Sequence, residues 1–65
     1  MKSVNFLRYL REHNCYSYRE GGNHTIVMNE LNKKISSIPR HKEIKNNLVK
    51  KICKDLDVPA PSSFQ

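Results

Sequence analysis

The stretch Arg19-Glu20-Gly21-Gly22-Asn23-His24-Thr25-Ile26-Val27 decides how this chain is expected to fold. Two adjacent glycines and an asparagine separate a run that contains Tyr16 and Tyr18 from a β-branched run that begins at His24. Glycines at a short connection between two such runs are typical of a β-hairpin. The glycine pair can also adopt backbone conformations that other residues avoid. The stretch therefore predicts a hairpin whose tight turn presents one titratable side chain, the imidazole of His24.

The segment before the hairpin has the features of a helix. Ser3 is a favourable N-cap residue, and His13-Asn14 is expected to end the helix, because asparagine tolerates the left-handed conformation that follows a helix end. Apolar residues recur between them at helical spacing, namely Val4, Phe6, Leu7 and Leu10. A helix with one buried face is therefore predicted immediately before the hairpin.

Three short strands are expected in the middle of the chain, over residues 15–19, 24–28 and 34–38. Strict alternation puts Tyr16 and Tyr18 on one face of the first strand and Arg19 on the other face, with Cys15 and Ser17. In the second strand, His24, Ile26 and Met28 are expected to share a face. Pro39 closes the third strand because it cannot donate to a sheet ladder.

A second helix is predicted near the C-terminus, with Asn46 or Asn47 as its cap. Its apolar stripe recurs at helical spacing, and the stripe consists of Leu48, Val49, Ile52, Cys53 and Leu56. Neither helix can bury its stripe alone, so both are expected on one face of an antiparallel three-stranded sheet. The predicted fold class is α+β, a two-layer α-β-β-β-α domain. Double-stranded RNA-binding domains have the same order of elements.

Composition places limits on the kind of protein this is. The chain of 65 residues is expected to form one domain over residues 1–58, followed by a flexible tail over 59–65. Cys15 and Cys53 have neither metal-clip spacing nor the pattern of a secreted disulfide scaffold, so free thiols in a reducing cytoplasm are expected, with a single bridge as the alternative. No leader and no membrane-length apolar run is apparent, which predicts a soluble cytoplasmic protein.

The charge of the chain is strongly one-sided. The net charge is +6, and the segment from Lys33 to Lys54 contains eight basic residues and one acidic residue, Glu43. A basic surface on a small domain indicates a polyanionic partner, most often nucleic acid. The alternative is a solvated surface that serves solubility alone.

Two blocks of this sequence resemble the HicA-type toxins, which are small mRNA interferases of type II toxin–antitoxin systems. The first block runs from Asn14 to His24, and the second runs from Ser37 to Lys45 and contains an apolar-Pro-x-His pattern. The resemblance implies a metal-independent and ribosome-independent endoribonuclease that cleaves mRNA. It also implies an acidic partner, a HicB-type antitoxin, which would cover the catalytic face.

The resemblance places His24 at the position of the catalytic histidine, where it would act as a general acid or base. Gly22 and Arg19 match the family's glycine and strand arginine, whereas Asn23 replaces a serine and Cys15 replaces an aromatic residue. The residues expected to contact RNA are Arg19, Gly22, Asn23, Lys33, Lys34, Arg40, Lys42 and Lys45. No cofactor and no metal site is expected, since no histidine or cysteine pair has ligand spacing.

Several points stay open at the level of sequence. His41, a lysine, Arg19 or water are candidates for the second acid or base. Tyr16 and Tyr18 could stack on bases or belong to the core. Two other functions also fit the pattern: a non-catalytic RNA-binding module, and a degenerate toxin that binds only its antitoxin. RNA cleavage separates the enzyme from both, and RNA binding separates the module from the interaction protein.

Overall fold

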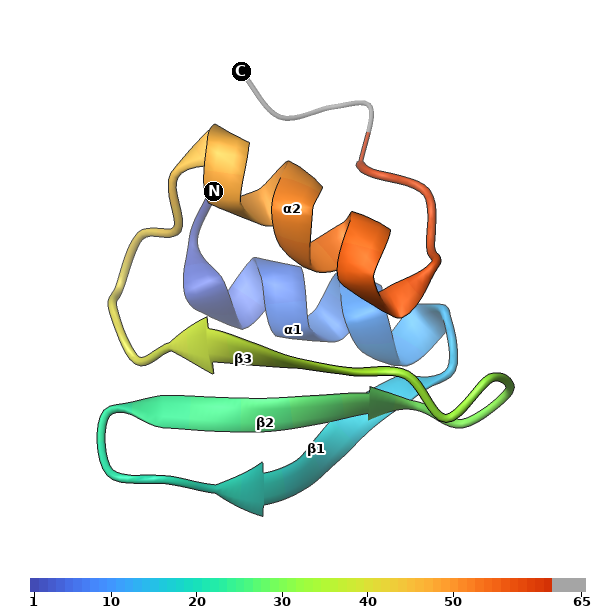
Figure 1. Cartoon of the computed structure of the whole chain (residues 1–65). Helices are drawn as coiled ribbons and strands as arrows, with labels where there is room; N and C mark the ends of the chain where they lie inside the picture. Colours follow the sequence, from blue (N-terminus) through green and yellow to red (C-terminus); the bar gives the residue numbers. More distant parts are fainter. Residues whose placement is uncertain (62–65) are drawn as a thin grey trace.

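The computed structural model describes residues 1–61, which form two helices and three strands (Figure 1). Along the chain the elements are α1 (Ser3–Glu12), β1 (Cys15–Glu20), β2 (His24–Asn29), β3 (Ile35–Pro39) and α2 (Asn46–Leu56). This order confirms the predicted α+β class, and the strand ends differ from prediction by one residue. Neither helix in residues 1–61 is long and apolar enough to cross a membrane. Residues 62–65 of the expected tail lie outside the described residues.

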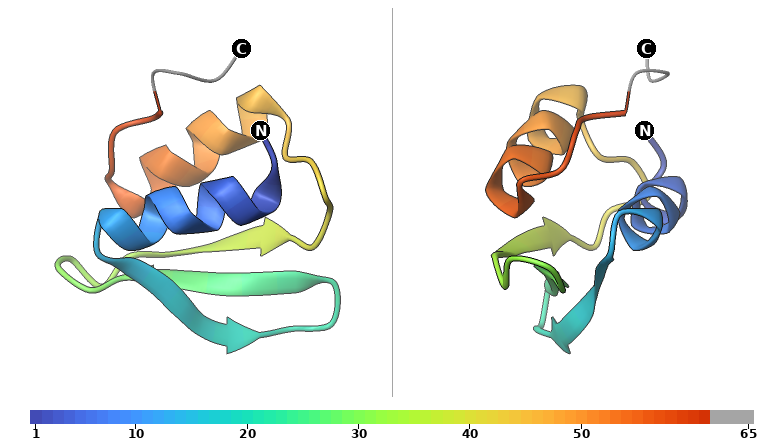
Figure 2. Two further views of the ribbon diagram at one scale, coloured as in Figure 1. Left: turned by 180° about the vertical axis from the view of Figure 1, so that it is seen from behind. Right: turned by 90° about the vertical axis from the view of Figure 1, so that its right-hand side faces the viewer.

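The sheet is antiparallel with the strand order β1-β2-β3, and both helices pack on the same face of it (Figure 2). Alternation along the central strand β2 separates the two faces. Thr25, Val27 and Asn29 are buried under the helices, whereas His24 is exposed on the opposite side. We call the side that carries His24, Ile26 and Met28 the open face. The predicted division of β2 between the two faces is therefore confirmed.

A β-bulge in β1 changes which side chains reach the open face. Ser17 pairs with Val27 and Arg19 pairs with Ile26, so Tyr18 is an extra residue between two consecutive pairs. A bulge of this kind shifts the alternation of a strand by one residue. Arg19 consequently lies on the open face, and the expectation from strict alternation that it shares a face with Cys15 and Ser17 was wrong.

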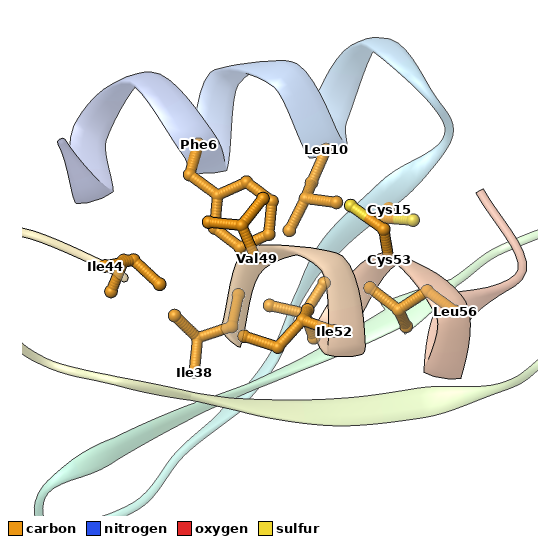
Figure 3. Packing of buried hydrophobic residues seen from close by; sticks show 10 residues of the cluster. Phe6, Leu10, Cys15, Ile38, Ile44, Val49, Ile52, Cys53 and Leu56 are labelled. Atoms are coloured by element: carbon orange, nitrogen blue, oxygen red, sulfur yellow. The ribbon is translucent and has the colours of Figure 1, made fainter. Parts of the chain in front are cut away.

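The core lies between the two helices and the covered face of the sheet (Figure 3). Its fully buried residues come from every element and from the connector after β3, and they are Phe6, Leu10, Cys15, Val27, Ile38, Ile44, Val49, Ile52, Cys53 and Leu56. The predicted stripe of α2 is buried except for Leu48, which is half-buried. Val4 was expected beside the α1 stripe but is exposed. Ile44 was not predicted to be buried, because it is an isolated apolar residue in a basic connector.

Both helices begin without the caps that the sequence suggests. Ser3 is the first helical residue rather than the N-cap, and its backbone N–H donates to the carbonyl of Lys42 over 2.9 Å. Asn46 likewise starts α2, with Lys45 at the N-cap position and no side-chain cap. The start of the chain pairs with the connector instead: the Ile44 N–H donates to the Met1 carbonyl over 2.8 Å. Main-chain partners that are distant in sequence therefore replace local capping at the start of α1.

The end of α1 agrees with the prediction. Asn14 has a φ of 67°, the left-handed conformation expected just after the helix.

At the other end of the chain, the Tyr9 hydroxyl donates to the Pro59 carbonyl, and Pro61 is buried. Residues 59–61 therefore make contacts with the rest of the domain.

Packing beside α1 is incomplete, in agreement with the small side chain at Cys15. A hollow of about 290 Å³ lies between α1 and β1, lined by residues that include Leu7, Leu10 and Cys15. Cys15 and Cys53 are both free and buried. Burial raises the pKa of the Cys53 thiol from 9.0 to about 11, and the charge of Cys15 adds to this effect. The thiols therefore stay protonated and belong to the apolar core.

The raised pKa of Cys53 predicts a loss of stability at alkaline pH. Between pH 9 and 11 the unfolded chain loses a thiol proton that the folded chain keeps, so the free energy of unfolding falls as the pH rises. Two pKa units correspond to about 3 kcal/mol at most. Denaturant titrations from pH 8 to 10.5, under reducing conditions, should show a steeper decline for the wild type than for Cys53→Val. Equal slopes would contradict the assignment, since lysine and tyrosine titration is common to both proteins.

Candidate functional site

The antiparallel topology gathers several segments at one end of the molecule, which we call the turn end (Figure 1). It comprises the β1–β2 turn with its flanking residues 20–24, the end of β3 with the connector over 39–45, and the first turns of both helices. The opposite end, here the far end, carries the β2–β3 turn over residues 30–34. Each residue that was predicted to contact RNA can therefore be assigned to a strand or to one of these ends.

The β1–β2 turn is held by backbone hydrogen bonds. The Gly21 N–H donates to the His24 carbonyl over 2.8 Å, and the Arg40 N–H donates to the Asn23 carbonyl over 3.0 Å. The second bond extends the pairing of β2 and β3 one step beyond the pair formed by His24 and Pro39. The turn is thus anchored to the connector as well as to its own hairpin.

The glycines do not adopt the conformation that the sequence suggested. Neither Gly21 nor Gly22 has a positive φ, so the turn does not use the left-handed conformations that a glycine pair allows. A Cβ atom added at Gly22 would meet no atom within 4 Å. The fold therefore does not require a glycine at this position. Because Gly22 has no side chain, the backbone next to His24 is uncovered.

His24 is exposed on the open face at the first position of β2. Its imidazole makes no hydrogen bond within residues 1–61, and the side chain of Asn23 does not bond to it. Arg19 occupies the same face of β1, diagonally across from His24, where side chains are separated by about 7–8 Å. The structure thus brings the predicted catalytic histidine and the strand arginine to one accessible surface.

Glu20 organises the turn end, and the sequence analysis did not identify it as a site residue. Its Oε1 atom accepts a hydrogen bond from the Thr25 hydroxyl over 3.3 Å and from the Arg40 guanidinium over 2.6 Å. Arg40 is therefore paired with a carboxylate and is less available to a phosphate than the sequence analysis assumed. Nothing in the sequence pairs these residues, because the contact depends on the register of all three strands.

The predicted basic residues fall into two separate groups. Lys42 and Lys45 lie at the turn end, and neither forms an ion pair within residues 1–61. Lys33 and Lys34 lie at the far end, beyond the other end of β2. Six residues of strand correspond to about 17 Å, so these two lysines do not share a site with His24. The basic residues are close to one another in the sequence, but in the structure they do not form one continuous basic surface.

His41 is not brought to the same surface as His24. It lines a pocket together with Thr25 and Ile38, which are on the covered side of the sheet, whereas His24 is on the open face. The suggestion that the two imidazoles act as a pair thus receives no support from their placement.

The open face is unusually apolar for an exposed surface. Tyr18 is 57% exposed and Ile35 is 54% exposed, and Tyr16 is also exposed. Tyr16 pairs with Met28, which pairs with Ile35, so these three side chains form a row across the sheet. Both tyrosines therefore lie outside the core, which leaves them available to bases or to a protein partner.

These features together can support acid–base chemistry on an anionic substrate. An accessible imidazole can accept or donate a proton near neutral pH, and Arg19 on the same face can contact a phosphate. The bare backbone at Gly22 leaves room for a substrate to approach closely.

Comparison with known proteins shows the family of the chain. The family model described as the HicA toxin of bacterial toxin–antitoxin systems matches residues 5–58, which include every secondary-structure element except the first two residues of α1. No match was found among curated proteins or among solved structures. Because the matched segment covers most of the chain, this protein belongs to the HicA family of toxins from bacterial toxin–antitoxin systems.

Proposed function

We propose that this chain is an endoribonuclease that cleaves mRNA without a ribosome and without a metal ion, with His24 as a general acid or base. The observation that carries the proposal is the placement of His24, exposed on the open face, with Arg19 on the same face and the bare backbone of Gly22 beside it. Membership in a toxin family adds the biological setting. Cleavage of mRNA by such a toxin would stop growth until the antitoxin returns.

The chemistry requires two proton transfers. A base removes the proton of a ribose 2′-hydroxyl, and the oxygen attacks the adjacent phosphorus. The bond from phosphorus to the 5′-oxygen then breaks, and that oxygen takes up a proton from an acid. The products are a 2′,3′-cyclic phosphate and a 5′-hydroxyl. His24 can perform either transfer, with water as the second group, while Arg19 stabilises negative charge on the non-bridging oxygens.

The direct test is incubation of the purified chain with single-stranded RNA, in the absence of ribosomes and in the presence of EDTA. Cleavage with cyclic-phosphate ends is the expected result. Salt-sensitive binding without cleavage would instead identify a non-catalytic RNA-binding module. A chain that neither binds nor cleaves RNA, but forms a stable complex with an acidic antitoxin, would be an interaction protein only.

Gly22→Ala tests whether the RNA contacts the β1–β2 turn, because this variant should leave the fold intact. The added methyl group meets no atom within 4 Å and the backbone φ is not positive, so the free energy of unfolding should change by less than about 0.5 kcal/mol. RNA cleavage should fall at least about tenfold if the RNA backbone passes over Gly22, because a misplaced substrate reacts slowly. Unchanged cleavage in a stably folded Gly22→Ala protein would show that the RNA does not approach this turn.

The partner that we propose is a HicB-type antitoxin that covers the open face. The apolar row of Tyr16, Met28 and Ile35 is continuous with the surface that holds Arg19 and His24. Exposed apolar patches of this kind are typical of protein interfaces. An acidic antitoxin seated there would block His24 and neutralise Arg19 at the same time. Ile35→Asp should weaken the complex, while RNA cleavage by the free toxin continues.

A further inference from the structure

A pocket of about 370 Å³ opens on the covered side of the sheet at the turn end. Its walls come from the start of α1, from the last row of the sheet and from the connector after β3, and they include Leu7, Glu20, Thr25, Ile38, Arg40 and Lys42. Its volume is within the range of sites that hold small ligands. The proposed cleavage reaction does not use this pocket.

The pocket adjoins the proposed catalytic site through the backbone. Thr25 is the next residue after His24, and Pro39 is the strand partner of His24, and both line the pocket. Paired strands are about 5 Å apart. Because the pocket is on the covered side and His24 is on the open face, an RNA strand that contacts both must pass around the turn end.

The lining has the chemistry of a nucleobase site. Leu7, Ile38 and Pro39 supply apolar surface on which a flat heterocycle can rest. Lys42 and His41 at the rim can contact the phosphate that is attached to the base. Single-stranded RNA is recognised in this way, with its bases turned outward and bonded along their Watson–Crick edges.

The position of Glu20 in the pocket suits it to distinguish between bases. Both hydrogen bonds that Glu20 accepts, from Thr25 and from Arg40, end on Oε1, and they hold the carboxylate in place. Oε2 accepts no hydrogen bond within residues 1–61. A carboxylate oxygen accepts from an exocyclic amino group, such as N4 of cytosine, whereas uracil presents the acceptor O4 at the same position and has only N3–H as a donor on that edge.

We propose that this pocket binds one unpaired, amino-bearing base of the RNA substrate and so sets the sequence preference of cleavage. The proposal rests on the proposed ribonuclease function, which it extends from chemistry to substrate selection. Glu20 reads the amino group, Arg40 holds Glu20 in position, and Lys42 contacts the phosphate.

The test is an NMR titration of the full-length His24→Ala protein with CMP, UMP and inorganic phosphate. CMP should shift the resonances of Leu7, Thr25 and Ile38 and should bind roughly fivefold or more tightly than UMP, as expected for one specific base contact. Glu20→Gln should remove this difference, because its amide places a donor beside the amino group. Lys42→Ala should weaken CMP binding, whereas Lys54→Ala, the same charge change at the end of α2, should not.

Equal affinity for CMP and UMP, or equal shifts with inorganic phosphate, would overturn the proposal. So would shifts confined to the open face. Glu20→Gln must first be shown to fold by its NMR spectrum, and Lys42→Ala provides an independent variant if it does not. Because binding is measured without cleavage, the proposed base-binding pocket and the proposed ribonuclease function can be refuted independently. A protein that cleaves RNA but does not bind CMP here is a ribonuclease that lacks this pocket function, and one that binds CMP without cleaving RNA is not a ribonuclease.

In the wild type, the base preference of this pocket should be visible in the distribution of cleavage sites. Cuts should cluster next to a base that carries an amino group, and Glu20→Gln should spread them over all four bases. A wild-type map without any base preference would contradict the proposal even if cleavage itself is strong.

Discussion

His24→Ala is expected to lower RNA cleavage by at least about a hundredfold, because a positioned acid or base contributes roughly 10²–10⁴ in rate. The side chain is exposed and makes no hydrogen bond within residues 1–61, so its removal should leave the fold unchanged. The measurement is single-turnover cleavage of a defined RNA. Growth and RNA integrity are followed in parallel in cells induced to express either protein.

Several variants distinguish acid–base chemistry from a loss of RNA binding. His24→Gln keeps hydrogen-bonding capacity but cannot transfer a proton, so it should bind RNA and fail to cleave it. His13→Gln removes a histidine beyond the end of α1, away from the turn end, and should retain activity.

Full toxicity of a stably folded His24→Ala protein would exclude the proposed role of this residue. Loss of growth arrest together with loss of RNA binding would also contradict acid–base catalysis, because it would identify His24 as a binding residue only. The assignment therefore depends on cleavage being lost while RNA binding remains.

Phe6→Ala should remove a large part of the domain's stability at 25 °C. Phe6 is 0% exposed and projects from α1 into the core, in the same buried cluster as Val49 of α2 (Figure 3). Removing a buried phenylalanine side chain costs about 3–5 kcal/mol. A domain of 65 residues has a total stability of roughly 3–10 kcal/mol. Loss of most of that margin should appear as a broad, low-temperature melt in far-UV circular dichroism.

Val4→Ala is the matched control for this experiment. Val4 lies in the same helix but is 57% exposed, so shortening it should change the stability by less than about 0.5 kcal/mol. A cooperative melt of Phe6→Ala close to that of the wild type would show that the core does not depend on this side chain.

Much of the fold could be predicted because its signals are local. The stripe from Val49 to Leu56 recurs with helical spacing, and Asn14 marks the end of α1 by its tolerance of a positive φ. The alternation of β2, with His24 on the open face, also follows from the sequence. Each of these features depends on residues that lie within a few positions of one another.

The site could be predicted only in part. The sequence identified His24 and Arg19, but it placed Arg19 on the wrong face because a bulge cannot be recognised from alternation alone. It grouped Lys33 and Lys34 with Lys42, although they lie at opposite ends of β3 in the structure. It missed Glu20, whose partners Thr25 and Arg40 come from two different strand pairings.

By itself, the sequence determined the order of elements, the hairpin with His24 at its turn, and the two helical stripes that must be buried. These follow from periodicity and from the conformational preferences of single residues. Tertiary structure alone decided the bulge in β1 and the backbone hydrogen bond between Ile44 and Met1. It also decided the hydrogen bond between Arg40 and Glu20 and the pocket beside them. The physical reason is that each of these depends on strand register and on contacts between distant segments, which form only when the whole chain packs.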